Sequence, residues 1–227
     1  MMMILKDVIA LSAKLCKQPI KAKLKYGTQK NFVGEIIDGY DSQAIDFALM
    51  SPISAENLCK VQNYLLETYG YGLLIYDAYR PKRAVKHFMF WSEQEPKNDY
   101  ELQRKAKHYP NVEKNKFFEL GYVAEDSGHC YGNTVDLVLI DSKTGKKIPM
   151  GSCYDYMDVD SHLTATPEMI GEEAYQNRKI LSDAMVKFGF HTYDEEFWHF
   201  SYGGKEGRET DIPMDLPITI QMKGLGV

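Results

Sequence analysis

The sequence has few cysteines, no excess of positive charge and no long hydrophobic run. Its 227 residues include four cysteines, and no two of them have Cys-x-x-Cys spacing. Free thiols in a reducing compartment are therefore expected rather than a disulfide scaffold. The net charge of −5 and the lack of a long basic patch argue against a nucleic-acid partner. No stretch approaches the length of an apolar membrane span, so no membrane partner is expected.

The first 25 residues also lack the features of a secretory signal. Their apolar runs are interrupted by Lys6, Asp7 and Lys14, and no small-residue cleavage site follows. We therefore expect a cytoplasmic protein and consider a periplasmic location less favoured. No internal repeat is apparent, and the length suits one domain, which we expect to span 1–227.

The stretch 127–141 is the most informative about chemistry, because a polar loop with two glycines runs directly into an apolar strand that contains Asp136. A lone buried carboxylate costs several kcal/mol, so Asp136 needs a cation, a metal or several hydrogen-bond donors. His129 lies seven residues earlier and could reach the same metal only if the chain folds back. Gly128 and Gly132 flank the segment that must do so, and glycine admits the positive φ that tight reversals often need.

A second candidate part of the site lies at 196–200, where another imidazole and another carboxylate occur together. His129, Asp136 and His199 would give zinc two nitrogens and one oxygen and leave the fourth tetrahedral position for water, as in catalytic sites. Glu196 would then be the base. Because residues three apart on an ideal strand point to opposite faces, a bend, bulge or helical turn at 197–198 is required.

Each of these residues has an alternative role when taken alone. His129 could be a loop or core histidine, and Asp136 a hydrogen-bonded structural carboxylate; no short motif of the His-Glu-x-x-His kind is present. Cys130 is a weak ligand candidate because neighbouring side chains of an extended chain point apart. His162 ranks below His199 because no recognisable motif surrounds it.

Five blocks of the sequence resemble the zinc D-alanyl-D-alanine dipeptidases, which share their zinc site with bacterial D,D-carboxypeptidases and the Hedgehog signalling domain. The blocks are Gly70 to Leu74, Tyr79 to Val85, Ser127 to Asp136, Pro149 to Asp158 and Glu196 to His199. The resemblance runs from about Tyr26 to about Tyr202. Ala78 and Thr134 depart from the family pattern, and neither is a candidate ligand.

The order of elements, without a regular βαβ repeat, predicts an α+β fold with a largely antiparallel sheet and packed helices. The resemblance implies the same fold, with one Zn²⁺ per chain in a cleft and a small D,D-dipeptide, first D-Ala-D-Ala, as the substrate. It also implies that Arg80 stabilises the oxyanion, that Asp155 receives the substrate ammonium, and that Tyr26 and Ser127 contact the substrate. Oligomeric state stays open.

Alternatives remain for the residues and for the function. Arg80 could be a surface arginine or pair with Asp77, and Asp155 could belong to a solvated acidic loop with Asp158 and Asp160. The protein could instead be a D,D-carboxypeptidase acting on longer stem peptides, although no export signal is recognised. It could also be a non-enzymatic zinc module of the Hedgehog type, for which Glu196 and Arg80 would be surplus.

Local patterns predict several elements. They are a strand-turn-strand unit over 26–48, a helix from an N-cap at Ser54 to Gly70, a strand over 71–76, a helix after Pro81, a polar loop or short helix over 93–116, and a helix over 172–188 closed by Gly189. Arg80 should thus lie at a strand-to-helix junction.

Overall fold

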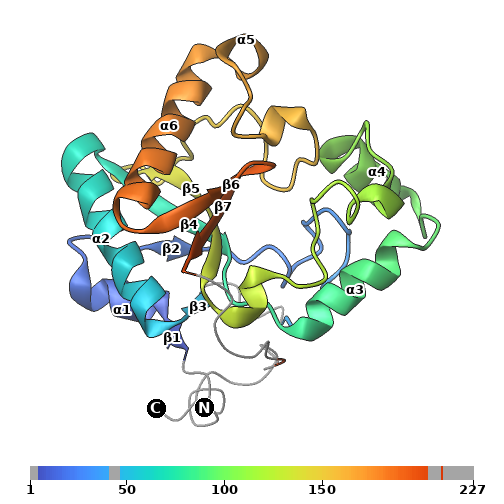
Figure 1. The fold of residues 1–227 in the computed structure, drawn as a ribbon, viewed down its shortest axis with the longest axis horizontal. Coiled ribbons are helices and arrows are strands. Elements are labelled where there is room, and N and C mark those ends of the chain that lie inside the picture. The colour runs from blue at the N-terminus through green and yellow to red at the C-terminus, as the bar shows by residue number, and fades with distance from the viewer. Residues whose placement is uncertain (1–4, 41–46, 204–210, 212–227) are drawn as a thin grey trace.

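The computed structural model describes residues 5–40, 47–203 and 211, which form a mixed α+β fold with helices around a central sheet (Figure 1). The main sheet has five strands in the order β2-β4-β5-β7-β6. Neighbouring strands within this sheet are antiparallel, except for β2 and β4, which are parallel. The predicted α+β class is therefore confirmed, and the sheet is largely antiparallel as expected.

The elements follow one another without a βαβ repeat. The helices are α1 (Val8–Leu15), α2 (Pro52–Tyr69), α3 (Lys82–Ser92), α4 (Asp99–His108), α5 (Pro167–Ile170) and α6 (Glu172–Lys187). The strands are β1 (Lys6–Asp7), β2 (Lys21–Ala22), β3 (Leu49–Met50), β4 (Tyr71–Asp77), β5 (Thr134–Asp141), β6 (Phe190–Tyr193) and β7 (Glu196–Tyr202). β1 and β3 pair in a separate two-stranded sheet.

The strand β5 lies at the centre of the main sheet and is buried on both faces, as its continuous apolar run predicts. Helix α2 packs against β4, and α6 packs against β5, β6 and β7. Figure 1 places α1, α2 and α6 to one side of the strands and α3 and α4 to the other. The single polar side chain within the middle of β5, Asp136, is consequently enclosed by the core.

Helix α2 begins three residues earlier than predicted. Ser51, not Ser54, is the N-cap, and Pro52 occupies the first turn, where its missing N–H has no partner to lose. The hydroxyl of Ser54 instead bonds to that of Ser51 at 2.7 Å. The C-terminal prediction is confirmed, since Gly70 ends the helix with φ 70° and ψ 20°.

The segment 26–40 contains no β-strand among its described residues, so the predicted strand-turn-strand unit is wrong there. Its aromatic residues pack instead as core: the Tyr26 and Phe32 rings both lie against Phe88 of α3, with centroids 5.2 Å apart in each pair. The predicted turn at Asp38 and Gly39 is present, whereas the one predicted at 41–42 lies outside the described residues. Packing between distant segments has overridden the local strand propensity.

The polar segment 93–116 folds partly as helix α4, which is capped by Asn98. Helix α6 agrees with the prediction and is followed by Gly189 at φ 89°. Within the described parts of the chain, no helix combines the length and apolar character needed to cross a membrane.

Gly70, at the end of α2, allows the cost of a left-handed backbone to be measured without any side-chain clash. A Cβ at Gly70 would meet no atom within 4 Å, yet the left-handed φ of 70° disfavours L side chains. We expect Gly70→Ala to lower the free energy of unfolding by about 1 kcal/mol. Gly70→Asn should lose less, because asparagine tolerates this conformation better. Urea denaturation measures both, and equal stability of Gly70→Ala and wild type would contradict the assignment.

Candidate metal centre

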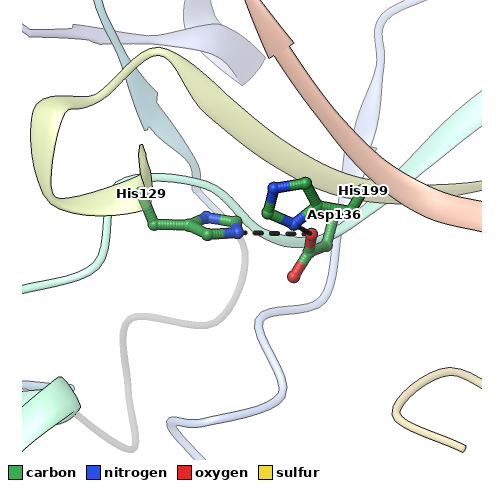
Figure 2. A group of neighbouring side chains, drawn as sticks. All are labelled: His129, Asp136 and His199. Atoms are coloured by element: carbon green, nitrogen blue, oxygen red, sulfur yellow. Dashed lines mark ion pairs between the residues drawn. The ribbon is translucent and has the colours of Figure 1, made fainter. Parts of the chain in front are cut away.

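Three titratable side chains form a row across the middle of the sheet. Asp136 of β5 pairs directly with His199 of β7 on one side and with Asp77 of β4 on the other. Directly opposed residues have Cβ atoms about 4.5–5.5 Å apart on one face of the sheet. The pairing alone therefore brings the carboxylate of Asp136 next to the imidazole of His199 (Figure 2).

A bulge in β4 makes this row possible. Ile75 pairs with Leu137 but Asp77 pairs with Asp136, so Tyr76 is an extra residue in β4. If the two strands paired without this bulge, Asp77 would lie opposite the residue that precedes Asp136 in β5. Bulges re-aim side chains in this way and are frequent beside active sites.

His129 reaches the same point from a 3₁₀ turn, Gly128–Tyr131, that ends at Gly132 with φ 70°. The predicted reversal between His129 and Asp136 is thus present, and Gly132 has the positive φ that was expected. Gly128 is needed for a different reason, because a Cβ there would clash with the Thr134 hydroxyl.

Reciprocal hydrogen bonds fix the orientation of His129. Its Nδ1 lies 2.6 Å from the Ala78 carbonyl oxygen, and its own carbonyl accepts from the Arg80 N–H at 3.2 Å. Because Nδ1 donates to a carbonyl, the neutral ring carries its lone pair on Nε2. That nitrogen points toward Asp136 (Figure 2).

The donor atoms of His129, Asp136 and His199 lie within 4.8 Å of one another. Asp136 Oδ1 is 3.3 Å from His129 Nε2 and 3.1 Å from His199 Nδ1. Yet neither Oδ1 nor His129 Nε2, both buried, has a hydrogen-bond partner among the described residues. Buried acceptor atoms that converge in this way are suited to a bound cation, and two nitrogens with one oxygen suit a divalent transition metal.

The electrostatics of Asp136 agree with this arrangement. Burial alone would raise the pKa of this carboxyl, but the neighbouring imidazoles of His129 and His199 outweigh burial and hold the pKa below its usual range. Asp136 is therefore ionised as a metal ligand must be. Tyr154 donates a hydrogen bond of 2.9 Å to Asp136 Oδ2, which leaves Oδ1 available as a metal ligand.

A second strand irregularity places Glu196 beside the three candidate ligands His129, Asp136 and His199, here called the metal group. Thr192 of β6 pairs with Phe200, whereas the next residue, Tyr193, pairs with Glu196, so three residues of β7 bulge between them. A bend, bulge or helical turn was predicted at 197–198, and the structure has a bulge that spans 197–199. It brings Glu196 Oε2 to 3.5 Å from His199 Nδ1, and burial together with Asp136 and Asp155 raises the pKa of Glu196 well above its usual range.

Arg80 lies at the predicted junction, between β4 and α3, and is buried. Its Nε donates to Asp77 Oδ2 at 2.9 Å, so the ion pair considered as an alternative exists. The ion pair does not take Arg80 out of the site, because Nη2 lies 3.7 Å from Asp136 Oδ2 and the side chain lines the cleft. Asp77 is itself held by the Tyr40 hydroxyl at 2.6 Å.

Asp155 is buried in the same cleft rather than solvated in an acidic loop. Tyr26 donates to its Oδ1 at 3.1 Å, whereas its buried Oδ2 has no hydrogen-bond partner in the described chain. Burial, with Asp136 nearby, raises the pKa of Asp155 well above its usual range. No described side chain donates a hydrogen bond to Oδ2, so this oxygen is available to a cationic ligand.

The cleft has a volume of about 340 Å³. All eight residues proposed for the site from the sequence line it: Tyr26, Arg80, Ser127, His129, Asp136, Asp155, Glu196 and His199. Of the described residues in this lining, Arg80 is the one lysine or arginine, against the buried carboxylates of Asp136, Asp155 and Glu196. A divalent cation and a positively charged ligand would favour the ionised forms of these crowded carboxyl groups, whose pKa values are raised at Asp155 and Glu196.

The weaker ligand candidates lie elsewhere. His162 Nε2 bonds to the Tyr122 hydroxyl at 3.0 Å, and Cys130 is buried outside the metal group. Sequence reasoning missed Tyr40 and Tyr154, which hold the two central carboxylates. With 16 tyrosines in the chain, no local signal distinguishes these two.

A mixed α+β fold in which two histidines, a buried aspartate and an adjacent buried glutamate converge in one cleft, together with the family match below, identifies a metallopeptidase. The family model described as D-ala-D-ala dipeptidase matches residues 13–216. The chain therefore belongs to the D-ala-D-ala dipeptidase family of peptidases.

Several similar proteins are named D-alanyl-D-alanine dipeptidase. A D-alanyl-D-alanine dipeptidase of Enterococcus faecium is 42% identical over 176 residues, which cover 78% of this chain and 82% of that protein. One of Streptomyces coelicolor is 39% identical over 202 residues, covering 88% and 93%. One of Escherichia coli is 31% identical over 131 residues, covering 58% and 55%.

The donor set predicts how metal binding responds to single histidine substitutions. We expect the purified protein to retain about one metal ion per chain, and His199→Ala to retain far less because only two donors remain. His162→Ala is the matched control and should retain as much as wild type. Elemental analysis after gel filtration measures all three, and undiminished metal in His199→Ala would refute the ligand set.

Proposed function

We propose that the protein is a zinc-dependent dipeptidase that hydrolyses D-alanyl-D-alanine to D-alanine. Membership of the D-ala-D-ala dipeptidase family and the names of its relatives support this substrate. We further propose that 1–227 form a single peptidase domain, with its zinc site in the cleft and a fold of the type shared with D,D-carboxypeptidases and the Hedgehog domain.

The observation that carries the dipeptide assignment is the buried, unpartnered Oδ2 of Asp155 in the same cleft as the metal group. An ammonium at the amino terminus of a dipeptide would pair with this oxygen. The positive charge of the ammonium would offset the negative charge of the carboxylates that line the cleft. A longer or acylated peptide presents a neutral amide there and leaves the charge of Asp155 uncompensated.

His129, Asp136 and His199 would hold one Zn²⁺ per chain, since their unsatisfied, convergent donor atoms fit such an ion. When bound there, zinc polarises a carbonyl and lowers the pKa of water. The hydrogen bond from His129 Nδ1 to the Ala78 carbonyl would keep the other ring nitrogen free as a ligand.

Glu196 would act as the general base. Its carboxylate would accept the proton of the attacking water and pass it to the leaving amine. Its position 3.5 Å from His199 Nδ1 supports this role, because it lies next to a ligand without being one of the three convergent donors.

Arg80 would stabilise the negative charge that develops on the scissile carbonyl oxygen. Asp77 engages Nε, and the Nη atoms make no hydrogen bond with any residue in the described parts of the chain. The arginine is thus held by one edge while its remaining donors stay available. A guanidinium fixed in advance stabilises charge at little reorganisation cost. Tyr26 and Ser127, which line the cleft, would contact the substrate.

A dipeptide panel tests the proposal directly. The purified, zinc-loaded protein should hydrolyse D-Ala-D-Ala and leave L-Ala-L-Ala essentially intact, with released amino acid as the readout. Failure to cleave any dipeptide while zinc is bound would refute the enzymatic assignment and favour a zinc-binding module.

The role assigned to Glu196 predicts a separation of metal binding from turnover. Glu196→Ala should keep its zinc but lose about 10²- to 10⁴-fold in kcat, the contribution typical of general acid–base catalysis. Glu195→Ala, one position outside β7, is the matched control and should stay near wild type. Near-normal kcat in zinc-bound Glu196→Ala would show that another group is the base.

Asp155 predicts selectivity for a free amino terminus. Losing one partner of a buried charge pair costs about 3–5 kcal/mol, so D-Ala-D-Ala should exceed N-acetyl-D-Ala-D-Ala and D-Ala-D-Ala-D-Ala in kcat/KM by roughly 10² or more. Asp155→Asn should lose most of this preference. Similar cleavage of all three substrates by the wild type would instead indicate a carboxypeptidase.

A further inference from the structure

Asp155 has a strained backbone. Its φ of 58° makes it the one non-glycine residue with positive φ in the described parts of the chain. This left-handed conformation costs about 1–2 kcal/mol for most L residues and less for aspartate, so contacts with neighbouring segments help to hold it here. The position of the Asp155 carboxylate therefore depends on the contacts that hold its backbone.

Those contacts come from the C-terminal end of α4. The ring Nδ1 of His108 lies 2.9 Å from the Asp155 carbonyl oxygen. The carbonyl of the same histidine accepts from the Met157 N–H at 2.7 Å. One residue of α4 thus holds the chain at two points directly after the Asp155 Cα, namely the Asp155 carbonyl and the Met157 N–H.

Arg104, one turn earlier on α4, determines which ring nitrogen of His108 carries the proton. Its Nη2 contacts His108 Nε2, and its Nε donates to the Asn31 carbonyl at 2.6 Å. A guanidinium can only donate, so Nε2 must accept and Nδ1 must carry the proton. Burial, with the charge of Arg104, lowers the pKa of His108 to about 3, so the ring stays neutral and keeps donating to Asp155.

The carboxylate end of Asp155 has weaker restraints than its backbone. Among the described residues, Tyr26 donates a hydrogen bond to Oδ1, and Oδ2 has no hydrogen-bond partner. Rotation of the peptide at Asp155 would swing the carboxylate away from its place in the cleft. Fixing the carbonyl oxygen is accordingly a way to fix Oδ2.

We propose that His108, oriented by Arg104, is a positioning residue that holds Asp155 for the substrate ammonium and so determines the preference for an unblocked amino terminus. The inference rests on the proposed function, in which Asp155 binds that ammonium. His108 touches neither the metal group nor the reacting bond, so its effect should fall on substrate selectivity rather than on the chemical step.

The test compares kcat and KM for D-Ala-D-Ala and N-acetyl-D-Ala-D-Ala in His108→Ala, His108→Asn and the exposed control His191→Ala. We expect His108→Ala to raise KM for D-Ala-D-Ala and to reduce the preference for the free dipeptide at least tenfold. His108→Asn should restore much of it, because its amide N–H replaces the Nδ1 donor. His191→Ala should match wild type.

A double variant separates positioning from general destabilisation. If His108 acts through Asp155, the change in preference caused by His108→Ala should vanish in an Asp155→Asn background. A fall in kcat with unchanged preference, or an effect that persists in that background, would overturn the inference and indicate a merely structural role.

The same data distinguish failure of the inference from failure of the proposed function. If Asp155→Asn abolishes the preference but His108→Ala does not, the inference is wrong and the role of Asp155 stands. If Asp155→Asn keeps the full preference, the role of Asp155 is itself wrong and the inference falls with it.

A measurement on the wild type does not depend on the folding of any variant. Nitrogen-15 NMR of the histidine rings should show His108 protonated on Nδ1 and not on Nε2 at neutral pH. The opposite tautomer, or a charged ring, would overturn the inference.

Discussion

The structure depends on a carboxylate buried in the central strand of the sheet. Asp136 lies in an otherwise apolar strand, enclosed on both faces, and its Oδ1 has no hydrogen-bond partner among the described residues. If this carboxylate were ionised with no compensating partner, its burial would cost several kcal/mol of stability. The surrounding elements therefore converge on it: a histidine from a 3₁₀ turn, a histidine from the neighbouring strand, and a tyrosine that takes the other oxygen. These converging donor atoms suit a divalent cation.

The neighbouring parts of the site are tied to this centre by backbone geometry. The bulge at Tyr76 sets Asp77 beside Asp136, and Asp77 in turn holds Arg80. The bulge in β7 turns Glu196 toward the metal group. Two irregularities in a regular sheet thus bring Glu196 and the Arg80 guanidinium next to the three candidate ligands. Such departures from ideal strands are what sheets use to re-aim side chains.

Much of the site could be predicted from local sequence. A carboxylate inside an apolar strand requires a partner, and glycines before it indicate a chain reversal; both predictions are confirmed at His129 and Asp136. The start of α2 was placed wrongly, because Ser51 and Ser54 are both suitable N-caps and Pro52, which favours the first helical turn, places the start at Ser51. In 26–40, aromatic residues with high strand propensity became core instead, because tertiary contacts with α3 outweigh local preference.

By itself the sequence determined the fold class, the central strand and the chemical types of the ligands, because these follow from hydrophobic pattern and from the cost of burying charge. Only the tertiary structure decided which tyrosines and which histidine support them. Tyr26 meets Asp155 across 129 positions and His108 meets it across 47. Contacts over such separations depend on strand register, bulges and helix placement, which are properties of the packed chain and have no local signature.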